Sequence, residues 1–356
     1  MDRMVGKDEA VERAARLANG TAPDAGTLTA GAAGRVLRVC GAPGTGKSEI
    51  CFRAFTDPRV RRLVAAGRAF LVVDSRSTAD AANSRLFKSF AGQAQRFAFR
   101  GGRPARTLAS LAFDVVRQQA KRSGEPEPKL LDGDEQSRLL RGIIGTHVRH
   151  AEIGDNGDCQ TCRLLQEYCA VRVRSDEDGG QTSAQAFRRL LGQEAITQLR
   201  DAIARFSELG ITDDETTFDS LATRGNVGHR RVVEWRTAAA LQRQYALRLA
   251  QEYPGQRRLD SSFLLVDAAR AVREMAGADG SADTGGVADA PGAAGASVNA
   301  EDSARAGLPA MLFVDDCQDL TMAGYSFIRS LVLAGTAVVL VGNDDDIQLE
   351  HSRYAD

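Results

Sequence analysis

The sequence predicts an α/β protein in which a parallel sheet is interrupted by an all-helical insertion. Three observations predict this class. Apolar runs of strand length at 35–40, 69–73, 310–314 and 337–341 alternate with amphipathic segments of helical period. A glycine-rich turn directly follows the first of these runs. Between about residues 119 and 258 the pattern is helical and polar, without a strand signal.

Length and composition limit the functional classes. The 356 residues are enough for two domains of roughly 150 residues each. A formal net charge of −1 gives no global attraction for nucleic acid, so such binding would need a local patch. Six cysteines in a chain of this size do not indicate a disulfide framework. The first residues lack the apolar core of a signal peptide, and no apolar run is long enough to span a bilayer. We therefore expect a cytoplasmic protein with no membrane partner.

The first part of the α/β domain is expected at 35–118. It follows a flexible or helical N-terminus at 1–34, with one short helix at 9–17. The strand at 35–40 leads through the glycine-rich turn into a helix at 49–55. The strand at 69–73 is followed by a polar segment and a helix, and Thr107 and Ser110 begin another helix.

The second part is expected at 259–276 and 309–356, after the insertion at 119–258. Within the insertion we predict helices at 135–144, 163–171, 184–209 and 232–253. A further helix follows at 261–275. Residues 277–308 contain too little apolar surface to offset their ordering entropy, so we predict a disordered linker. A strand, helix and strand then follow closely, which predicts parallel strands with a right-handed crossover.

The glycine-rich turn fits the P-loop pattern G-x-x-x-x-G-K-[ST] at every fixed position. It lies between a predicted buried strand and a helix start, where backbone N–H groups can surround phosphates. Lys47 would reach the β- and γ-phosphates, and the Ser48 hydroxyl would ligate Mg²⁺. The simpler alternative is a glycine-rich turn with a chance lysine. The motif predicts binding of ATP with Mg²⁺ by Gly41, Ala42, Pro43, Gly44, Thr45, Gly46, Lys47 and Ser48.

A second phosphate-site signal is the apolar strand that ends in Asp315 and Asp316. This is the Walker B form, in which the first carboxylate holds Mg²⁺ and the second orients the attacking water. Taken alone, it could be a buried strand with an acidic loop. Its occurrence together with a P-loop favours a nucleotide site.

Residues 315–319, Asp-Asp-Cys-Gln-Asp, resemble motif II, D-E-x-Q-D, of superfamily 1A DNA helicases of the UvrD/Rep/PcrA and AdnA/AdnB type. Residues 341–346 stand where that family has motif III. The segments 74–86 and 106–113 are similar to motifs Ia and Ib. The segments 131–140 and 259–265 resemble two further stretches of the same helicases, and the resemblance covers 35–356 in the family's order.

The resemblance implies a RecA-like P-loop NTPase domain whose helical insertion corresponds to domain 1B. It implies an ATP-dependent DNA helicase or translocase of DNA repair or recombination, with ATP and Mg²⁺ as cofactors and DNA as partner. In these roles Lys47 and Asp316 are catalytic, Ser48 and Asp315 hold the metal, and Asp346 faces the γ-phosphate. DNA would be bound by Ser75, Arg76, Arg100, Arg103 and Thr107.

Departures from the family pattern favour an alternative function. Asp316 replaces the usual glutamate and Asp346 the usual glutamine of motif III. The chain ends just after motif III, so we expect it to need a second RecA-like domain or subunit for motifs IV to VI. The alternative is a degenerate pseudo-helicase fragment that binds nucleotide or DNA without turnover.

Two secondary clusters have competing interpretations. Arginines at 96, 100, 103 and 106 surround two phenylalanines, which would suit a single DNA strand or a solvated turn. The pairs His147/His150 and Cys159/Cys162 have zinc-like spacings, but we expect unpaired thiols and a solvated histidine pair rather than zinc. Cys40 and Cys51 are expected to be buried packing residues.

Overall fold

The structure is a computed structural model that describes residues 6–19, 35–89, 103–155, 158–172, 182–209, 218, 228–261, 263–276 and 307–343. The chain divides into two compact units. Unit 1 comprises Met1–Ser123 and Leu265–Asp356, and unit 2 comprises Gly124–Leu264. The expected N-terminal segment 20–34 and most of the expected linker, 277–306, lie outside the described residues.

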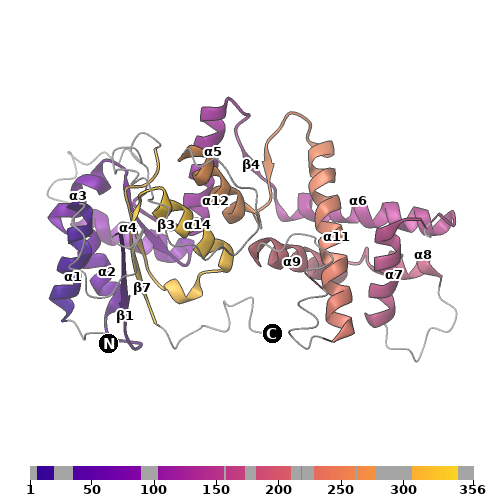
Figure 1. Ribbon diagram of the computed structural model, residues 1–356, viewed down its shortest axis with the longest axis horizontal. Helices are drawn as coiled ribbons and strands as arrows, with labels where there is room; N and C mark the ends of the chain where they lie inside the picture. Colours follow the sequence, from indigo (N-terminus) through magenta and orange to yellow (C-terminus); the bar gives the residue numbers. More distant parts are fainter. Residues whose placement is uncertain are drawn as a thin grey trace, which may run out of the picture. The chain divides into compact units, whose positions relative to one another are not determined.

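Unit 1 is built on a five-stranded, all-parallel sheet with the order β1-β7-β6-β2-β3, compatible with a Rossmann or RecA-like fold (Figure 1). The strands are β1 (Val36–Cys40), β2 (Ala69–Val73), β3 (Ala105–Thr107), β6 (Met311–Val314) and β7 (Ala337–Gly342). The helices are α1 (Lys7–Arg16), α2 (Lys47–Phe55), α3 (Pro58–Ala65), α4 (Arg76–Ser89), α5 (Leu108–Ser123), α12 (Leu264–Met275) and α14 (Met322–Leu333), with short 3-10 turns η1 (Leu17–Asn19) and η3 (Cys317–Asp319).

Helices cover both faces of this sheet. Buried residues of α1 to α4 pack against one set of strand side chains, and Phe55 of α2 meets Phe313 of β6 edge-on at 5.4 Å between ring centroids. The alternate side chains Leu312 and Val314 are also fully buried, and Figure 1 shows α12 and α14 on that opposite side. A sheet covered on both faces explains why β2 and β6 read as continuous apolar runs.

Two strand predictions need correction. β1 is only partly buried, because among the described strands it lies at the edge of the sheet, beside β7. Cys40 at its end is exposed, whereas Cys51 is buried as expected. β3 was not predicted at all. It is held by the buried Asn83 of α4, whose amide donates to Ala105 O at 2.8 Å and accepts from Ala105 N at 2.9 Å.

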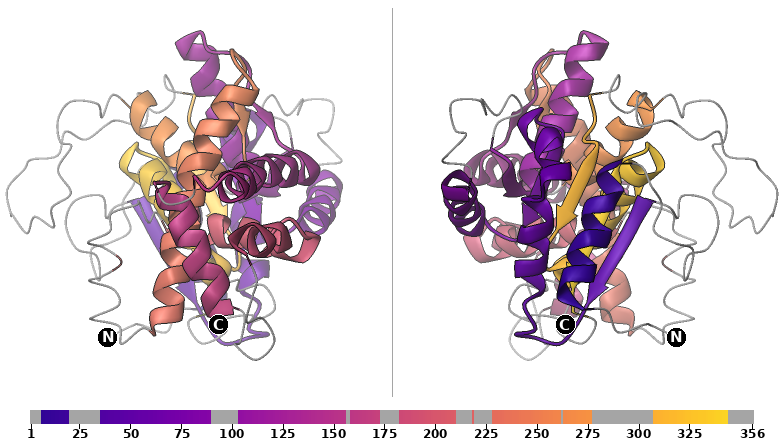
Figure 2. Two further views of the ribbon diagram at one scale, coloured as in Figure 1. Left: turned by 90° about the vertical axis from the view of Figure 1, so that its right-hand side faces the viewer. Right: turned by 90° about the vertical axis from the view of Figure 1, so that its left-hand side faces the viewer.

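Unit 2 is mainly helical, and Figure 2 shows its helices from a second direction. Its helices are α6 (Gly133–Glu152), α7 (Gln160–Arg172), α8 (Ser183–Arg189), α9 (Gln193–Leu209) and α11 (His229–Glu252). The single helix predicted at 184–209 is two helices, because the chain turns at 190–192. The expectation of no strand is also wrong: β4 (Lys129–Leu130) and β5 (Arg258–Leu259) form a short parallel pair.

A buried polar contact joins the two ends of unit 2. Asp260 accepts a hydrogen bond from the amide of Gln136 at 2.9 Å and another from the Tyr245 hydroxyl at 2.6 Å. Asp132 and Glu135 form a capping box that begins α6. Gln136 and Asp260 come from the two segments, 131–140 and 259–265, that resemble helicase sequences, whereas Tyr245 lies on α11. The structure therefore brings these two distant segments into contact.

Candidate functional site

The P-loop connects β1 to α2 as a tight turn. Gly44 and Gly46 have φ angles of 75° and 84°, a left-handed conformation that glycine adopts without strain. The Thr45 backbone N and hydroxyl both donate to Ala42 O, at 3.3 and 2.8 Å. Because α2 begins at Lys47, the positive end of its dipole lies at this turn.

Two lysines lie at the P-loop. The Lys47 ammonium folds back onto the turn and donates to Gly41 O at 2.6 Å and to Ala42 O at 2.8 Å. The ammonium of Lys7, on α1, lies 3.1 Å from the point that a Cβ on Gly46 would occupy. Lys7 was missed by the sequence analysis, because only the packing of α1 against α2 brings it here. Both charges and the helix terminus favour an anion at the loop.

Asp315 lies at the carboxyl end of β6, where its backbone N donates to Val72 O at 3.0 Å. Burial and the neighbouring Asp316 raise the pKa of the Asp315 carboxyl, although a hydrogen bond from the Ser48 hydroxyl and the charge of Lys47 act in the opposite direction. The two residues expected to hold the metal are therefore in direct contact. Their hydroxyl and carboxylate oxygens are the hard ligands that Mg²⁺ prefers.

Asp316 follows in a left-handed conformation with φ of 50°, and its side chain is exposed. Gln318 connects this turn to β7: its amide N donates to Asp316 Oδ1 at 3.2 Å, and its amide O accepts from Asn343 N at 3.0 Å. A Cβ on Gly342 would lie 2.5 Å from that same amide O. The turn at 316–318 is therefore hydrogen-bonded to, and closely packed against, the end of β7. Asp346 lies outside the described residues.

The residues expected to bind DNA are partly accounted for. The Ser75 hydroxyl accepts from Thr78 N at 3.1 Å at the start of α4, and Thr107 Oγ1 accepts from Ser110 N at 3.2 Å at the start of α5. Arg76 is exposed, and Arg103 forms an exposed ion pair with Asp80. Arg100 lies outside the described residues. The hydroxyls of Ser75 and Thr107 therefore stabilise the starts of α4 and α5.

Arg106 does not belong to an exposed basic patch, contrary to the sequence expectation. Its side chain is 9% exposed and pairs with Asp114 at 2.5 Å. The guanidinium also lies 4.5 Å from the ring centroid of Phe70 and donates to Arg103 O. Arg106 is a structural residue, because pairing with a carboxylate and stacking on an aromatic ring offset its burial.

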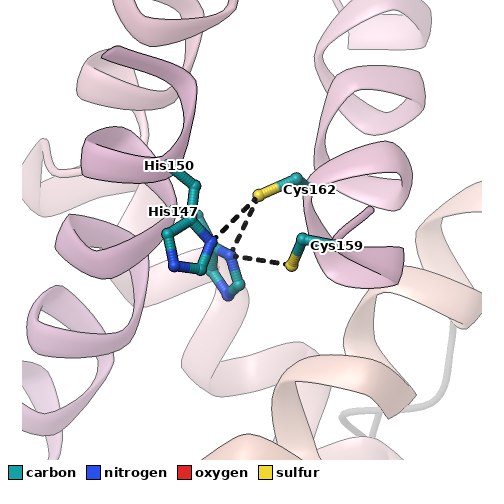
Figure 3. Close-up of side chains that lie close together, drawn as sticks. All are labelled: His147, His150, Cys159 and Cys162. Atoms are coloured by element: carbon teal, nitrogen blue, oxygen red, sulfur yellow. Dashed lines mark hydrogen bonds between the residues drawn. The ribbon is translucent and has the colours of Figure 1, made fainter. Parts of the chain in front are cut away.

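The two histidines and two cysteines with zinc-like spacing form a cluster in unit 2 (Figure 3). One potential ligand atom from each of His147, His150, Cys159 and Cys162 lies within 4.8 Å of all the others. His147 is 2% exposed and Cys162 is fully buried. Both cysteines are unpaired thiols, as expected. The expectation of a solvated histidine pair is wrong for His147, because α6 and α7 pack side by side at this point.

No profile of a known protein family and no curated protein matches this chain. In the part of the chain that the structure describes, every helix is too short or too polar to cross a membrane.

Proposed function

We propose that unit 1 binds ATP with Mg²⁺ at the P-loop. One observation carries this proposal: the Ser48 hydroxyl, at the start of α2, hydrogen-bonds to Asp315 at the carboxyl end of β6, and the charge of Lys47 acts on the same carboxyl, although these residues are far apart in sequence. Crevices at the carboxyl ends of parallel strands are the usual ligand sites of such sheets. In this site Lys47 would face the β- and γ-phosphates, while Ser48 and Asp315 would hold the metal.

We further propose that the chain is the ATP-binding half of a UvrD-like DNA helicase or translocase. Support comes from the order of the helicase-like motifs and from the unit of helices inserted between β3 and β6. The bridge from Gln318 to Asn343 also links the segments that resemble motifs II and III. In this role Asp316 orients the attacking water. DNA and a second RecA-like domain or subunit are the partners, in DNA repair or recombination.

The alternative, nucleotide binding without turnover, is favoured by the position of Asp316. Its side chain is one methylene shorter than the usual glutamate, and one of its oxygens already accepts from Gln318. A shorter carboxylate that already accepts a hydrogen bond from Gln318 is less able to orient the water that attacks the γ-phosphate. The two functions share the binding site and differ only in the chemical step.

Steady-state ATP hydrolysis, with and without single-stranded DNA, separates these functions. In the helicases that the sequence resembles, arginines of a second domain neutralise the γ-phosphate, which contributes on the order of 10³ to 10⁵ in rate. We therefore expect the 356-residue chain alone to turn over well below about 1 s⁻¹. Faster, DNA-stimulated hydrolysis that is lost in Lys47→Ala would contradict this expectation and establish the motor. Asp316→Glu tests whether the shorter side chain limits the rate.

A further inference from the structure

We propose that His147, His150, Cys159 and Cys162 form a structural zinc site in unit 2. This site is independent of the nucleotide site, since all of its groups lie within Gly124–Leu264. The histidines are three residues apart in the last turns of α6, so both project from the same face of that helix. Cys159 directly precedes α7, and Cys162 lies in its first turn. Figure 3 shows the four side chains directed at one another between the two helices.

Three sulfur-to-nitrogen distances in the cluster are close to those of a tetrahedral zinc complex. With Zn–S of about 2.3 Å and Zn–N of about 2.0 Å, the S···N edges of a tetrahedron are about 3.5 Å. His147 Nδ1 lies 3.2 Å from Cys162 Sγ and 3.6 Å from Cys159 Sγ. His150 Nδ1 lies 3.7 Å from Cys162 Sγ. These separations leave space for a single ion at the centre.

Residues outside the cluster orient His147 for metal binding. Its Nε2 hydrogen-bonds to Gln244 Oε1 at 2.8 Å, and the Gln244 amide N in turn bonds Thr161 Oγ1 at 2.8 Å. Because Gln244 Oε1 is an acceptor, His147 Nε2 must carry the proton, and the Nδ1 lone pair is directed toward the sulfurs. Such an outer hydrogen bond to a ligating histidine is a general feature of zinc sites.

The donor set identifies the ion and its role. Two thiolates and two imidazoles suit Zn²⁺, and four protein ligands leave no open position, which is typical of a structural rather than a catalytic site. Two thiolates balance the charge of Zn²⁺, so the complex is neutral and its burial beside the hydrophobic core of unit 2 is not opposed by an unpaired charge. The ion would connect the end of α6 to the beginning of α7 and stabilise that corner of the unit.

Metal analysis of the purified full chain, prepared without chelators, tests the proposal. We expect about one zinc ion per chain in the wild type and in Cys40→Ser, whose thiol is exposed in unit 1, and none in Cys159→Ser/Cys162→Ser. Wild-type protein reconstituted with Co²⁺ after chelation should show intense thiolate-to-cobalt absorption, a readout that needs no variant. Zinc-free wild-type protein without such absorption overturns the proposal. Zinc retained in the double variant, or iron in place of zinc, also overturns it.

Gln244→Ala tests the geometry without removing a ligand. We expect zinc affinity to fall by about 10- to 100-fold, because the imidazole of His147 loses its orienting partner. Gln242→Ala is the matched control, since this side chain lies on the same helix but bonds Ser207 instead. Its zinc affinity should equal that of the wild type. Equal affinity of both variants would show that the cluster does not bind zinc in the geometry proposed.

Discussion

Residues of the proposed nucleotide site can be named from the sequence where a local motif defines them. The sequence motifs place Lys47 and Ser48 at a helix start and Asp315 just after a strand, and the structure has the same local elements at these positions. Lys7 was missed, and Arg106 was expected in an exposed basic cluster, on a DNA strand or in a solvated turn, although it is buried against Phe70 and Asp114. Both errors have one cause: the surroundings of these side chains come from other elements, which periodicity does not reveal.

Lys7 provides the first prediction at this scale. We expect Lys7→Ala to weaken Mg²⁺–ATP binding by about two- to fivefold, less than Lys47→Ala, because an exposed ammonium is screened by solvent. The difference between wild type and Lys7→Ala should shrink at high salt. Titration with a fluorescent ATP analogue at two salt concentrations measures both effects. If Lys7→Ala and wild type bind Mg²⁺–ATP with equal affinity at low salt, Lys7 does not contribute to nucleotide binding.

Gly342 gives the second prediction. A Cβ at this position would lie 2.5 Å from Gln318 Oε1 and 2.6 Å from Cys317 Sγ. Gly342→Ala should therefore lower the free energy of unfolding by about 1–3 kcal/mol, as overpacking does. Urea unfolding followed by circular dichroism measures this. Gly142→Ala, on α6, is the control, because its Cβ would meet nothing within 4 Å. If both variants are equally stable, the close packing between η3 and β7 is not present.

Whole elements were predictable according to their length and regularity. β2, β6 and β7 were found within one or two residues, because long apolar runs of strand length require burial in a sheet covered on both faces. β3, β4 and β5 have at most three residues each, too few to produce a periodicity. They exist because of partners such as Asn83, which binds β3. The break between α8 and α9 was not predicted, because the amphipathic periodicity continues through the segment 184–209 without interruption.

The start of α3 supports a prediction on pH. Asp57 caps this helix by accepting from Arg59 N at 2.9 Å, and Pro58 follows at the first helical position. Burial alone would raise the pKa of the Asp57 carboxyl, but hydrogen bonds and charge from Arg59 outweigh it, so the pKa is lowered. The stabilisation is therefore complete above the unfolded-state pKa of about 4 and is lost as pH falls through the lower, folded-state value.

Asp57→Ala should accordingly cost about 1 kcal/mol at neutral pH, the usual cost of losing an N-cap. The difference from wild type should decrease in acid below about pH 4, as the wild-type carboxyl becomes protonated. Urea unfolding at neutral and acidic pH tests this. A difference that is independent of pH would mean that charge has no part in the cap.

At the scale of the whole molecule, the sequence indicated an α/β framework with an inserted helical segment, and the structure shows two units that divide at Gly124 and Leu264. The cluster of two histidines and two cysteines was not predictable from spacing alone. Its four side chains come together only because α6 and α7 pack against each other, and α11 supplies Gln244. The strands of the sheet in unit 1 could be predicted from the sequence, whereas the grouping of the four side chains in unit 2 depends on tertiary packing.

If unit 1 tracks a single DNA strand, its exposed arginines should determine the salt dependence of binding. Arg76 and Arg103 are exposed, although Arg103 pairs with Asp80. Replacing both by alanine should reduce the slope of log K against log salt by about 1.4, because each phosphate that is no longer neutralised lowers the slope by about 0.7. Fluorescence anisotropy with a labelled oligonucleotide at several salt concentrations measures the slope. An unchanged slope would exclude these two residues from the DNA-binding surface.

Calorimetric titration of Mg²⁺–ATP into the full chain tests the central claim most directly. Wild type and Lys121→Ala, which removes an exposed lysine of α5, should bind equally well. Lys47→Ala should bind at least about tenfold more weakly, a loss of about 1.4 kcal/mol, because the charge facing the phosphates is gone. Binding of the wild type should also require Mg²⁺. Equal affinities for wild type and Lys47→Ala would contradict the assignment of the P-loop as the nucleotide site.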